Sequence, residues 1–187
     1  MSLQRRIKES AQFSWATLTQ PQKTGALVPS SPMLAEKLAE LVKDTGLPNV
    51  IELGPGTGAI TSRLLKAGPI KALEFNPEFV LFLKKKYPRL HVKEGDARHL
   101  DRYFNPNKPT VIISGIPLRA LSKEDRTHIL HSIHRFLEKS GGIYIQFTYD
   151  LITRPQTLYP TFRPLSSHYV WANVPPARIH VLEGIPR

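Results

Sequence analysis

A glycine-rich turn preceded by an acidic residue is the first feature of the chain that could do chemistry. In the sequence VIELGPGTGAI, residues 50–60, Glu52 stands just ahead of Gly54, Gly56 and Gly58. Glycines remove Cβ atoms and permit unusual backbone angles, so a ligand can lie against the backbone there. A carboxylate at Glu52 would repel a pyrophosphate but can accept hydrogen bonds from an ammonium group. The alternative interpretation is a tight strand-to-helix turn without a ligand.

Two further acids and a serine follow the next three apolar runs. Glu74 stands in LEF, Asp96 in GDA, and Ser114 ends the run TVIIS. A carboxylate at Glu74 can accept from both hydroxyls of a ribose, and Asp96 can accept from an adenine amino group. The alternatives are a solvated charge at a strand end for Glu74 and a turn or cap residue for Asp96. The glycine spacing matches neither the P-loop nor the G-x-G-x-x-G pattern, which argues against a phosphate-binding loop.

Alternating strands and helices must bring these side chains to one edge of a sheet. Periodicity predicts an α/β fold: an open, seven-stranded, mostly parallel sheet with helices on both faces. Ligands of such sheets bind beyond the carboxyl ends of the strands. Three prolines make residues 151–166 a predicted loop. Strands are predicted at 49–53, 70–75, 90–95, 110–116, 142–149, 167–174 and 177–184, and helices at 30–44, 59–67, 77–87 and 122–140.

Composition limits the class of protein. The 187 residues suit one domain, and the absence of cysteine excludes disulfides and thiolate metal sites. No apolar stretch approaches the ~18 residues that span a bilayer, and the first twenty residues lack a signal-peptide pattern. We therefore expect a cytoplasmic protein. The net charge of +11 favours an anionic partner, either nucleic acid or a membrane surface, with a basic surface kept for solubility as the alternative.

The N-terminal segment predicts a helix that lies in a membrane interface. Residues 3–19, wound at 3.6 residues per turn, place an apolar stripe beside basic residues, with Trp15 suited to headgroup depth. An amphipathic helix packed on the domain is the alternative. The stripe consists of Leu3, Ile7, Ala11, Trp15 and Leu18.

Taken together, the motifs ELGPGTG, LEF and GDA resemble the class I, Rossmann-like methyltransferases that use S-adenosylmethionine. Over nearly the whole chain, GALVPSSP, SGIPL, IQFTY and WANVPPARIHVL resemble the small bacterial phospholipid N-methyltransferases. These enzymes convert phosphatidylethanolamine to phosphatidylcholine by up to three methyl transfers. The resemblance implies a monomer that is peripheral on the inner membrane, binds its anionic surface and takes a phospholipid substrate. It also implies an interface helix and lid over 1–30 and a methyltransferase domain over 31–187.

The same resemblance implies which residues contact the cofactor. Lys23 and the lid residues Thr24, Gly25, Ser30 and Ser31 would cover it, although the two serines may equally be helix caps. The remaining contacts would come from the strand ends: Glu52, Gly54, Gly56, Gly58, Glu74, Phe75, Asp96, Ala97, Ser114 and Gly115.

The segment SGIPL discriminates between methyl acceptors. Enzymes that methylate base amines carry Asn or Asp, then Pro and an aromatic residue, because the delocalised lone pair must be drawn out while the base is stacked. Here Ser114 or Gly115 takes the Asn position and Leu118 the aromatic one. An aliphatic amine needs only positioning and desolvation once it loses a proton. No nucleic-acid partner is therefore expected. The rivals are an RNA or rRNA adenine N6-methyltransferase and a non-catalytic membrane- or RNA-binding module.

Acceptor-site residues are predicted around the ends of the fourth and fifth strands. Tyr149 and Ser114 are the catalytic candidates, with a core-edge tyrosine as the alternative for Tyr149. The histidines His128, His131 and His134 are predicted to form a polar helix face, so no metal is expected. Substrate contacts are predicted at Leu118, Arg119, Tyr149, Arg154 and Arg178, with Arg163 as a further phosphate candidate. A solvated surface charge is the alternative for each arginine. An apolar slot for the lipid tails is predicted from Leu118, Leu121, Leu151, Ile152, Leu158 and Phe162.

Overall fold

A single twisted sheet organises the part of the chain that the computed structural model describes, residues 31–185. The predicted N-terminal helix and the lid residues Lys23, Thr24, Gly25 and Ser30 lie outside this part. The strand order is β3-β2-β1-β4-β5-β7-β6, and β7 alone runs against its neighbours, so the predicted mostly parallel α/β sheet is confirmed. The strands are β1 (Asn49–Leu53), β2 (Lys71–Glu74), β3 (His91–Glu94), β4 (Thr110–Ser114), β5 (Gly142–Thr148), β6 (Phe162–Val170) and β7 (Ala177–Gly184).

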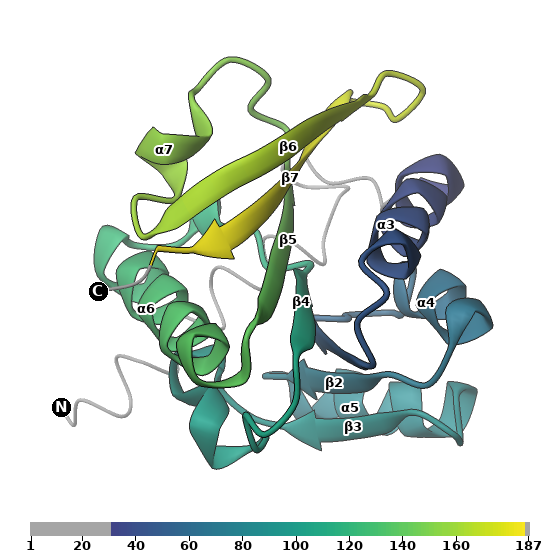
Figure 1. Cartoon of the computed structure of the whole chain (residues 1–187). Coiled ribbons are helices and arrows are strands. Elements are labelled where there is room, and N and C mark those ends of the chain that lie inside the picture. The colour runs from purple at the N-terminus through teal and green to yellow at the C-terminus, as the bar shows by residue number, and fades with distance from the viewer. Residues whose placement is uncertain (1–30, 186–187) are drawn as a thin grey trace, which may run out of the picture.

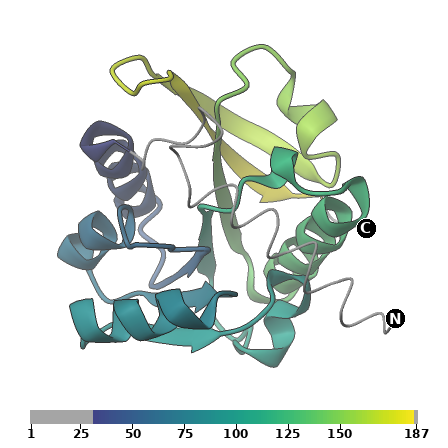
Figure 2. The same ribbon diagram turned by 180° about the vertical axis from the view of Figure 1, so that it is seen from behind.

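Helices cover both faces of the sheet, as Figures 1 and 2 show from opposite sides. One core cluster joins α3, α4 and α5 to the sheet, and a second joins η1 and α6 to its other face. Two short turns of helix, η2 and α7, flank the second cluster. The bounds are α3 (Pro32–Asp44), α4 (Thr61–Ala67), α5 (Pro77–Lys86), η1 (Ala97–Arg102), η2 (Leu118–Ala120), α6 (Lys123–Ser140) and α7 (Pro155–Leu158).

Local signals explain where the long helices begin. The Ser31 hydroxyl accepts from the Leu34 amide at 3.2 Å and Pro32 opens α3, so Ser31 is the predicted cap. The Ser122 hydroxyl caps α6 in the same way, accepting from the Asp125 amide at 3.0 Å.

Register brings the predicted site residues to one edge. In the pairing of β1 with its two neighbours, Leu53 lies opposite Leu73 of β2 and Ser114 of β4. All five residues of β4 are buried, as expected for a central strand covered on both faces. The carboxyl ends of β1, β2 and β4 therefore meet, and Glu74 and Ser114 lie at that edge.

The prediction of a loop over 151–166 is wrong in part, and β6 begins and ends earlier than the predicted strand 167–174, whereas β7 has its predicted bounds. Pro155 opens the short helix α7, where its missing N–H costs nothing, and β6 begins at Phe162. Pro164 is tolerated because β6 is the last strand of the sheet, with one edge unpaired. Residues 171–174, predicted as strand, lie in the turn between β6 and β7.

Candidate cofactor and acceptor site

The glycine turn after β1 is shaped by backbone contacts from two neighbouring strand ends. Gly56 has a φ of 55°, a conformation that favours glycine, and its amide donates to Glu74 Oε2 at 3.0 Å. The chain leaving β4 passes close by, because the Gly115 amide donates to the Leu53 carbonyl at 2.8 Å. A Cβ at Gly115 would lie 2.8 Å from the Gly54 carbonyl oxygen, so a side chain there would push the two segments apart.

Glu74 is buried, which rules out the alternative of a solvated strand-end charge. Its Oε1 accepts from the Asn76 amide at 2.8 Å, while Oε2 holds Gly56. Burial raises the pKa of Glu74, and the backbone amides of Asn76 and Gly56 oppose that rise. Each carboxylate oxygen has a second lone pair, so the side chain retains acceptor capacity for sugar hydroxyls.

Glu52 carries a buried oxygen without a partner. Its Oε2 accepts from the Thr61 hydroxyl at 2.7 Å, but Oε1 has no hydrogen-bond partner within the described residues. Burial raises the pKa of Glu52 to about 7, with the Thr61 hydrogen bond opposing it and the nearby Glu74 adding to it. A buried acceptor without a hydrogen-bond partner lowers the stability of the fold unless a ligand supplies a donor, and an ammonium group is a suitable donor.

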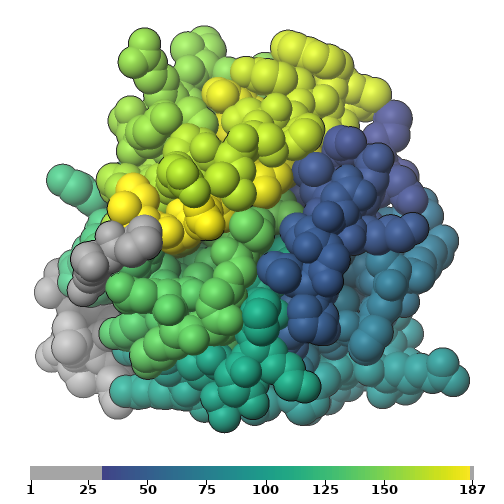
Figure 3. Space-filling model, in the orientation of Figure 1, coloured from purple at the N-terminus to yellow at the C-terminus, as the bar shows by residue number. Residues whose placement is uncertain are grey.

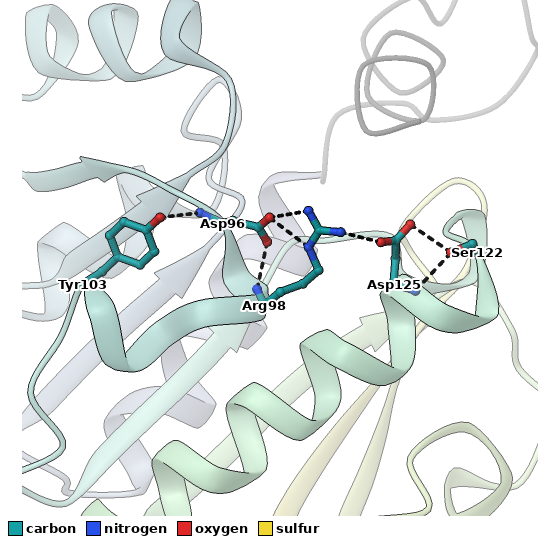
Figure 4. Close-up of polar contacts among 5 residues, drawn as sticks. All are labelled: Asp96, Arg98, Tyr103, Ser122 and Asp125. Atoms are coloured by element: carbon teal, nitrogen blue, oxygen red, sulfur yellow. Dashed lines mark hydrogen bonds and ion pairs between the residues drawn. The ribbon is translucent and has the colours of Figure 1, made fainter. Parts of the chain in front are cut away.

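Asp96 caps η1 and is clamped by Arg98, as Figure 4 shows. Asp96 Oδ1 accepts from the Arg98 amide at 2.9 Å, and Oδ2 accepts from Arg98 Nε at 2.8 Å. Arg98 Nη1 reaches on to Asp125 Oδ1 at 2.7 Å, and Asp125 is bound in turn by Ser122. The alternative interpretation of Asp96 as a cap residue is confirmed. Its role toward adenine stays a prediction, and no pattern in the sequence predicts the Arg98 clamp that orients it.

A buried glutamine at the end of β5, which the sequence analysis missed, holds the segment that follows β4. Gln146 Nε2 donates to the carbonyls of Ser114 at 3.4 Å and Ile116 at 3.2 Å. The Tyr144 hydroxyl donates to Gln146 Oε1 at 2.5 Å and so fixes which way the amide points. The signal was present in the sequence, since a glutamine inside the apolar run IYIQF needs buried partners.

Tyr149 stands just beyond β5, half-buried against the core cluster of α3. Its ring packs edge-on against Phe147, 5.9 Å between ring centroids, and burial raises the pKa of its hydroxyl, with Asn173 opposing that rise. Asn173 Oδ1 also accepts from the Ser31 amide at 3.1 Å, which ties the β6–β7 turn to the start of α3. A second residue that sequence reasoning missed therefore connects Tyr149 to the predicted lid residue Ser31.

The predicted phosphate-binding arginines differ in how far they are engaged. Arg119 pairs with Asp150, and Arg163 pairs with Glu183. Arg178 Nη1 donates to the carbonyls of Leu151 and Thr153 at 3.4 and 3.3 Å. Arg154 is exposed and has no side-chain partner in the described part of the chain. Arg154 is therefore the candidate that an anion could engage without breaking a contact.

Two predictions about this region are wrong. Leu118 and Phe162 do not line an apolar slot, because both are buried in the core cluster of α6. His134 is not on an exposed or boundary helix face: it is buried, and its Nε2 lies 2.8 Å from the Ile185 carbonyl. Among residues 31–185 no group of side chains could hold a metal ion, and no helix is long and apolar enough to cross a bilayer.

Comparison with known proteins agrees with this geometry. A family model described as a methyltransferase domain matches residues 50–141. The chain is a class I methyltransferase. Its cofactor is S-adenosylmethionine. The fold matches the magnesium protoporphyrin IX methyltransferase of Synechocystis, solved with that cofactor bound, at a TM-score of 0.68 and 11% identity over 98% of this chain and 99% of the other.

Two curated relatives of this methyltransferase differ in how much of the chain they cover. The ornithine lipid N-methyltransferase of Singulisphaera acidiphila is 26% identical over 86% of this chain and 88% of its own. The ribosomal RNA small subunit methyltransferase A of Maridesulfovibrio salexigens is 31% identical, over 48% of this chain and 36% of its own. The match to the lipid enzyme thus spans most of both chains, whereas the match to the RNA enzyme is partial.

Proposed function

We propose that the chain transfers methyl groups from S-adenosylmethionine to the amine of phosphatidylethanolamine and its mono- and dimethyl derivatives, forming phosphatidylcholine. The observation that carries the proposal is the state of the segment after β4. The Ile116 carbonyl already accepts from both Gln146 Nε2 and the Leu118 amide, Gln146 also donates to the Ser114 carbonyl, and the Leu118 side chain is buried in the core. A base amine would need free acceptors and an exposed aromatic ring at these positions, whereas an aliphatic amine needs neither.

The chain's own residues would hold the cofactor through the strand ends. The unpartnered Oε1 of Glu52 suits the ammonium of the amino-acid part, and the glycine turn is open at Gly56, where a Cβ would have no atom within 4 Å. Glu74 would take the ribose hydroxyls and Asp96 the adenine amino group. When bound, S-adenosylmethionine supplies an electrophilic methyl group for in-line displacement.

On the acceptor side, the residues would position a neutral amine. The nitrogen must lose a proton before each of the first two transfers, after which its lone pair is free to attack. The ring of Tyr149 would face the methylated ammonium, a contact of roughly 0.5–2 kcal/mol. Arg154 would bind the lipid phosphate as a charge-assisted donor.

The relatives support an acceptor in the lipid class. The similarity to an ornithine lipid N-methyltransferase covers most of both chains, and that lipid also offers a primary amine for methylation. The second candidate, an RNA adenine N6-methyltransferase, is favoured by the net charge of +11 and by the partial match to the ribosomal RNA enzyme.

A transfer assay separates the candidates. The full chain is incubated with methyl-labelled S-adenosylmethionine and one of three acceptors: short-chain phosphatidylethanolamine below its critical micelle concentration, ornithine lipid in detergent, or ribosomal RNA. We expect label in the first lipid. Label in ornithine lipid alone would keep the lipid-amine class and reject phosphatidylethanolamine, and label in RNA alone would overturn the proposal.

A further inference from the structure

Four exposed apolar side chains gather on two segments that are far apart in the sequence. Ile152, just before α7, is 92% exposed, and Trp171 and Val174, in the β6–β7 turn, are 68% and 74% exposed. Tyr169 at the end of β6 is 44% exposed and stacks on Trp171, with 5.3 Å between ring centroids and 8° between ring planes. We name this set, Ile152, Tyr169, Trp171 and Val174, the aromatic ledge.

Contacts through Arg178 make the ledge one surface. Its guanidinium lies 5.2 Å from the centre of the Tyr169 ring and donates to the carbonyls on either side of Ile152, those of Leu151 and Thr153. In Figure 1 the segment between β5 and α7 and the β6–β7 turn both lie at the top, and Figure 3 shows them as projections on that side. One arginine thus braces both halves of the ledge.

The ledge lies at the edge of the sheet where the cofactor site is built. β5 runs parallel to β4, and the start of β7 pairs with the end of β5, with Arg178 opposite Thr148. The segment after β5 and the turn before β7 are therefore at the same edge as Ser114. A surface that docked on the ledge would face the acceptor end of the site.

The sequence around the ledge is mainly basic, and Asp150, which directly precedes it and accepts from the Ile152 amide, is already paired with Arg119. Residues 151–182 contain Arg154, Arg163 and Arg178 and no aspartate or glutamate. Arg163 pairs with Glu183, which leaves Arg154 and Arg178 as the cations nearest the ledge in the sequence. Tryptophan and tyrosine flanked by arginine suit the headgroup level of a membrane that carries negative charge.

We propose that the aromatic ledge docks the protein on an anionic lipid bilayer, with Trp171, Val174 and Ile152 entering the headgroup region. The inference rests on the proposed lipid substrate, because docking here would present the acceptor end of the site to the bilayer. Bases of RNA would gain stacking from aromatic rings but little from Ile152 and Val174, the two most exposed members of the ledge. Because the aliphatic side chains of the ledge are more exposed than its aromatic pair, the ledge favours a lipid partner over a nucleic acid.

The fluorescence of Trp171 tests the inference directly. The chain has two tryptophans, so Trp15→Phe leaves Trp171 as the only one. Vesicles of phosphatidylethanolamine and phosphatidylglycerol are added to this variant, with and without lipids that carry a quencher in the upper acyl chain. We expect a blue shift of the emission and quenching by the labelled lipid. Vesicle binding without either change would overturn the proposal, since another part of the chain would then make the contact.

Paired substitutions supply the second measurement. Trp171→Ser with Val174→Ser should lower the vesicle partition coefficient about tenfold, whereas the control Leu81→Ser should leave it unchanged. Leu81 is 68% exposed on α5, at the opposite end of the molecule in Figures 1 and 2. An equal loss in both variants, or none in either, would reject the ledge. A shift of Trp171 emission with protein concentration alone would instead make the ledge an interface between copies.

Activity on dispersed lipid keeps this inference separate from the proposed function. The double variant should keep its transfer rate on monomeric short-chain phosphatidylethanolamine and lose it on vesicles. If wild type transfers to neither lipid form but Trp171 still enters vesicles, the substrate proposal fails and the docking surface stands. If transfer to vesicles is the same in the double variant and wild type, the docking surface fails and the substrate proposal stands.

Discussion

At the scale of single residues, the unpartnered oxygen of Glu52 links protein stability to pH. Burial raises the pKa of Glu52 from its ordinary 4.5 to about 7, so the folded protein binds a proton that the unfolded chain releases. The stability that this proton contributes is complete below pH 4.5 and is lost as the pH rises through 7. The difference amounts to about 3 kcal/mol for the cofactor-free protein.

Glu52→Gln should therefore stabilise the cofactor-free protein at pH 8 by up to about 3 kcal/mol and change it little at pH 5. The neutral amide still accepts from Thr61 and carries no charge to bury. Urea unfolding at both pH values measures the effect. The same variant should bind S-adenosylmethionine at least about tenfold more weakly, since an ammonium loses its anionic partner. A stability change that is equal at both pH values would contradict the assignment.

Gln146 carries a second prediction at this scale. Gln146→Leu removes one amide: the Tyr144 hydroxyl loses its acceptor, the Ser114 and Phe147 carbonyls lose a donor, and the Ile116 carbonyl keeps only the Leu118 amide. We expect a loss of about 2–4 kcal/mol in the free energy of unfolding. Tyr144→Phe is the matched control, because it removes only the hydroxyl and should cost about 1 kcal/mol. A larger loss in Tyr144→Phe would mean that the glutamine amide is not what holds the segment after β4.

At the scale of elements, the sequence predicted best where one helix or strand has a single apolar pattern. β1, α3 and α6 lie at or within two residues of their predicted bounds, because caps and burial agree there. The loop prediction for residues 151–166 is wrong because proline breaks a helix only in its interior. Pro155 opens the helix α7, and Pro164 lies in β6, a strand with one unpaired edge. The substrate-contact prediction for Leu118 is wrong because a hydrophobic residue near a site suits the protein core equally well. Sequence periodicity does not distinguish a core residue from a residue that lines a binding slot.

The clamp between η1 and α6 is the element-scale feature to test. Arg98 bridges Asp96 and Asp125, and both acids are partly exposed, so solvent weakens each pair. A double-mutant cycle of Arg98→Ala and Asp125→Ala should give a coupling energy of about 1 kcal/mol. Arg98→Ala should also weaken S-adenosylmethionine binding by about tenfold in calorimetry, because Asp96 loses the group that orients it. If Arg98→Ala binds S-adenosylmethionine with full affinity, either Asp96 does not contact the adenine, or its position as the cap of η1 is enough to orient it without Arg98.

At the scale of the whole molecule, the net charge of +11 and the predicted helix over residues 3–19 give the last prediction. Deletion of residues 1–19 should weaken binding to anionic vesicles several-fold and leave the affinity for S-adenosylmethionine within about twofold, since the strand-end residues remain. Raising the salt from about 0.05 to 0.5 M should weaken vesicle binding of the full chain further, because screening shortens the reach of its basic residues.

Comparing the deletion with the ledge variant shows how the two surfaces combine. If the helix and the aromatic ledge contact the same bilayer, removing both should reduce vesicle binding by about the product of the separate reductions. Calorimetry with S-adenosylmethionine is the control that each variant is folded. Equal sedimentation of the full and shortened chains with vesicles would reject the interfacial helix, and the aromatic ledge would then have to account for the membrane binding that the proposed lipid substrate requires.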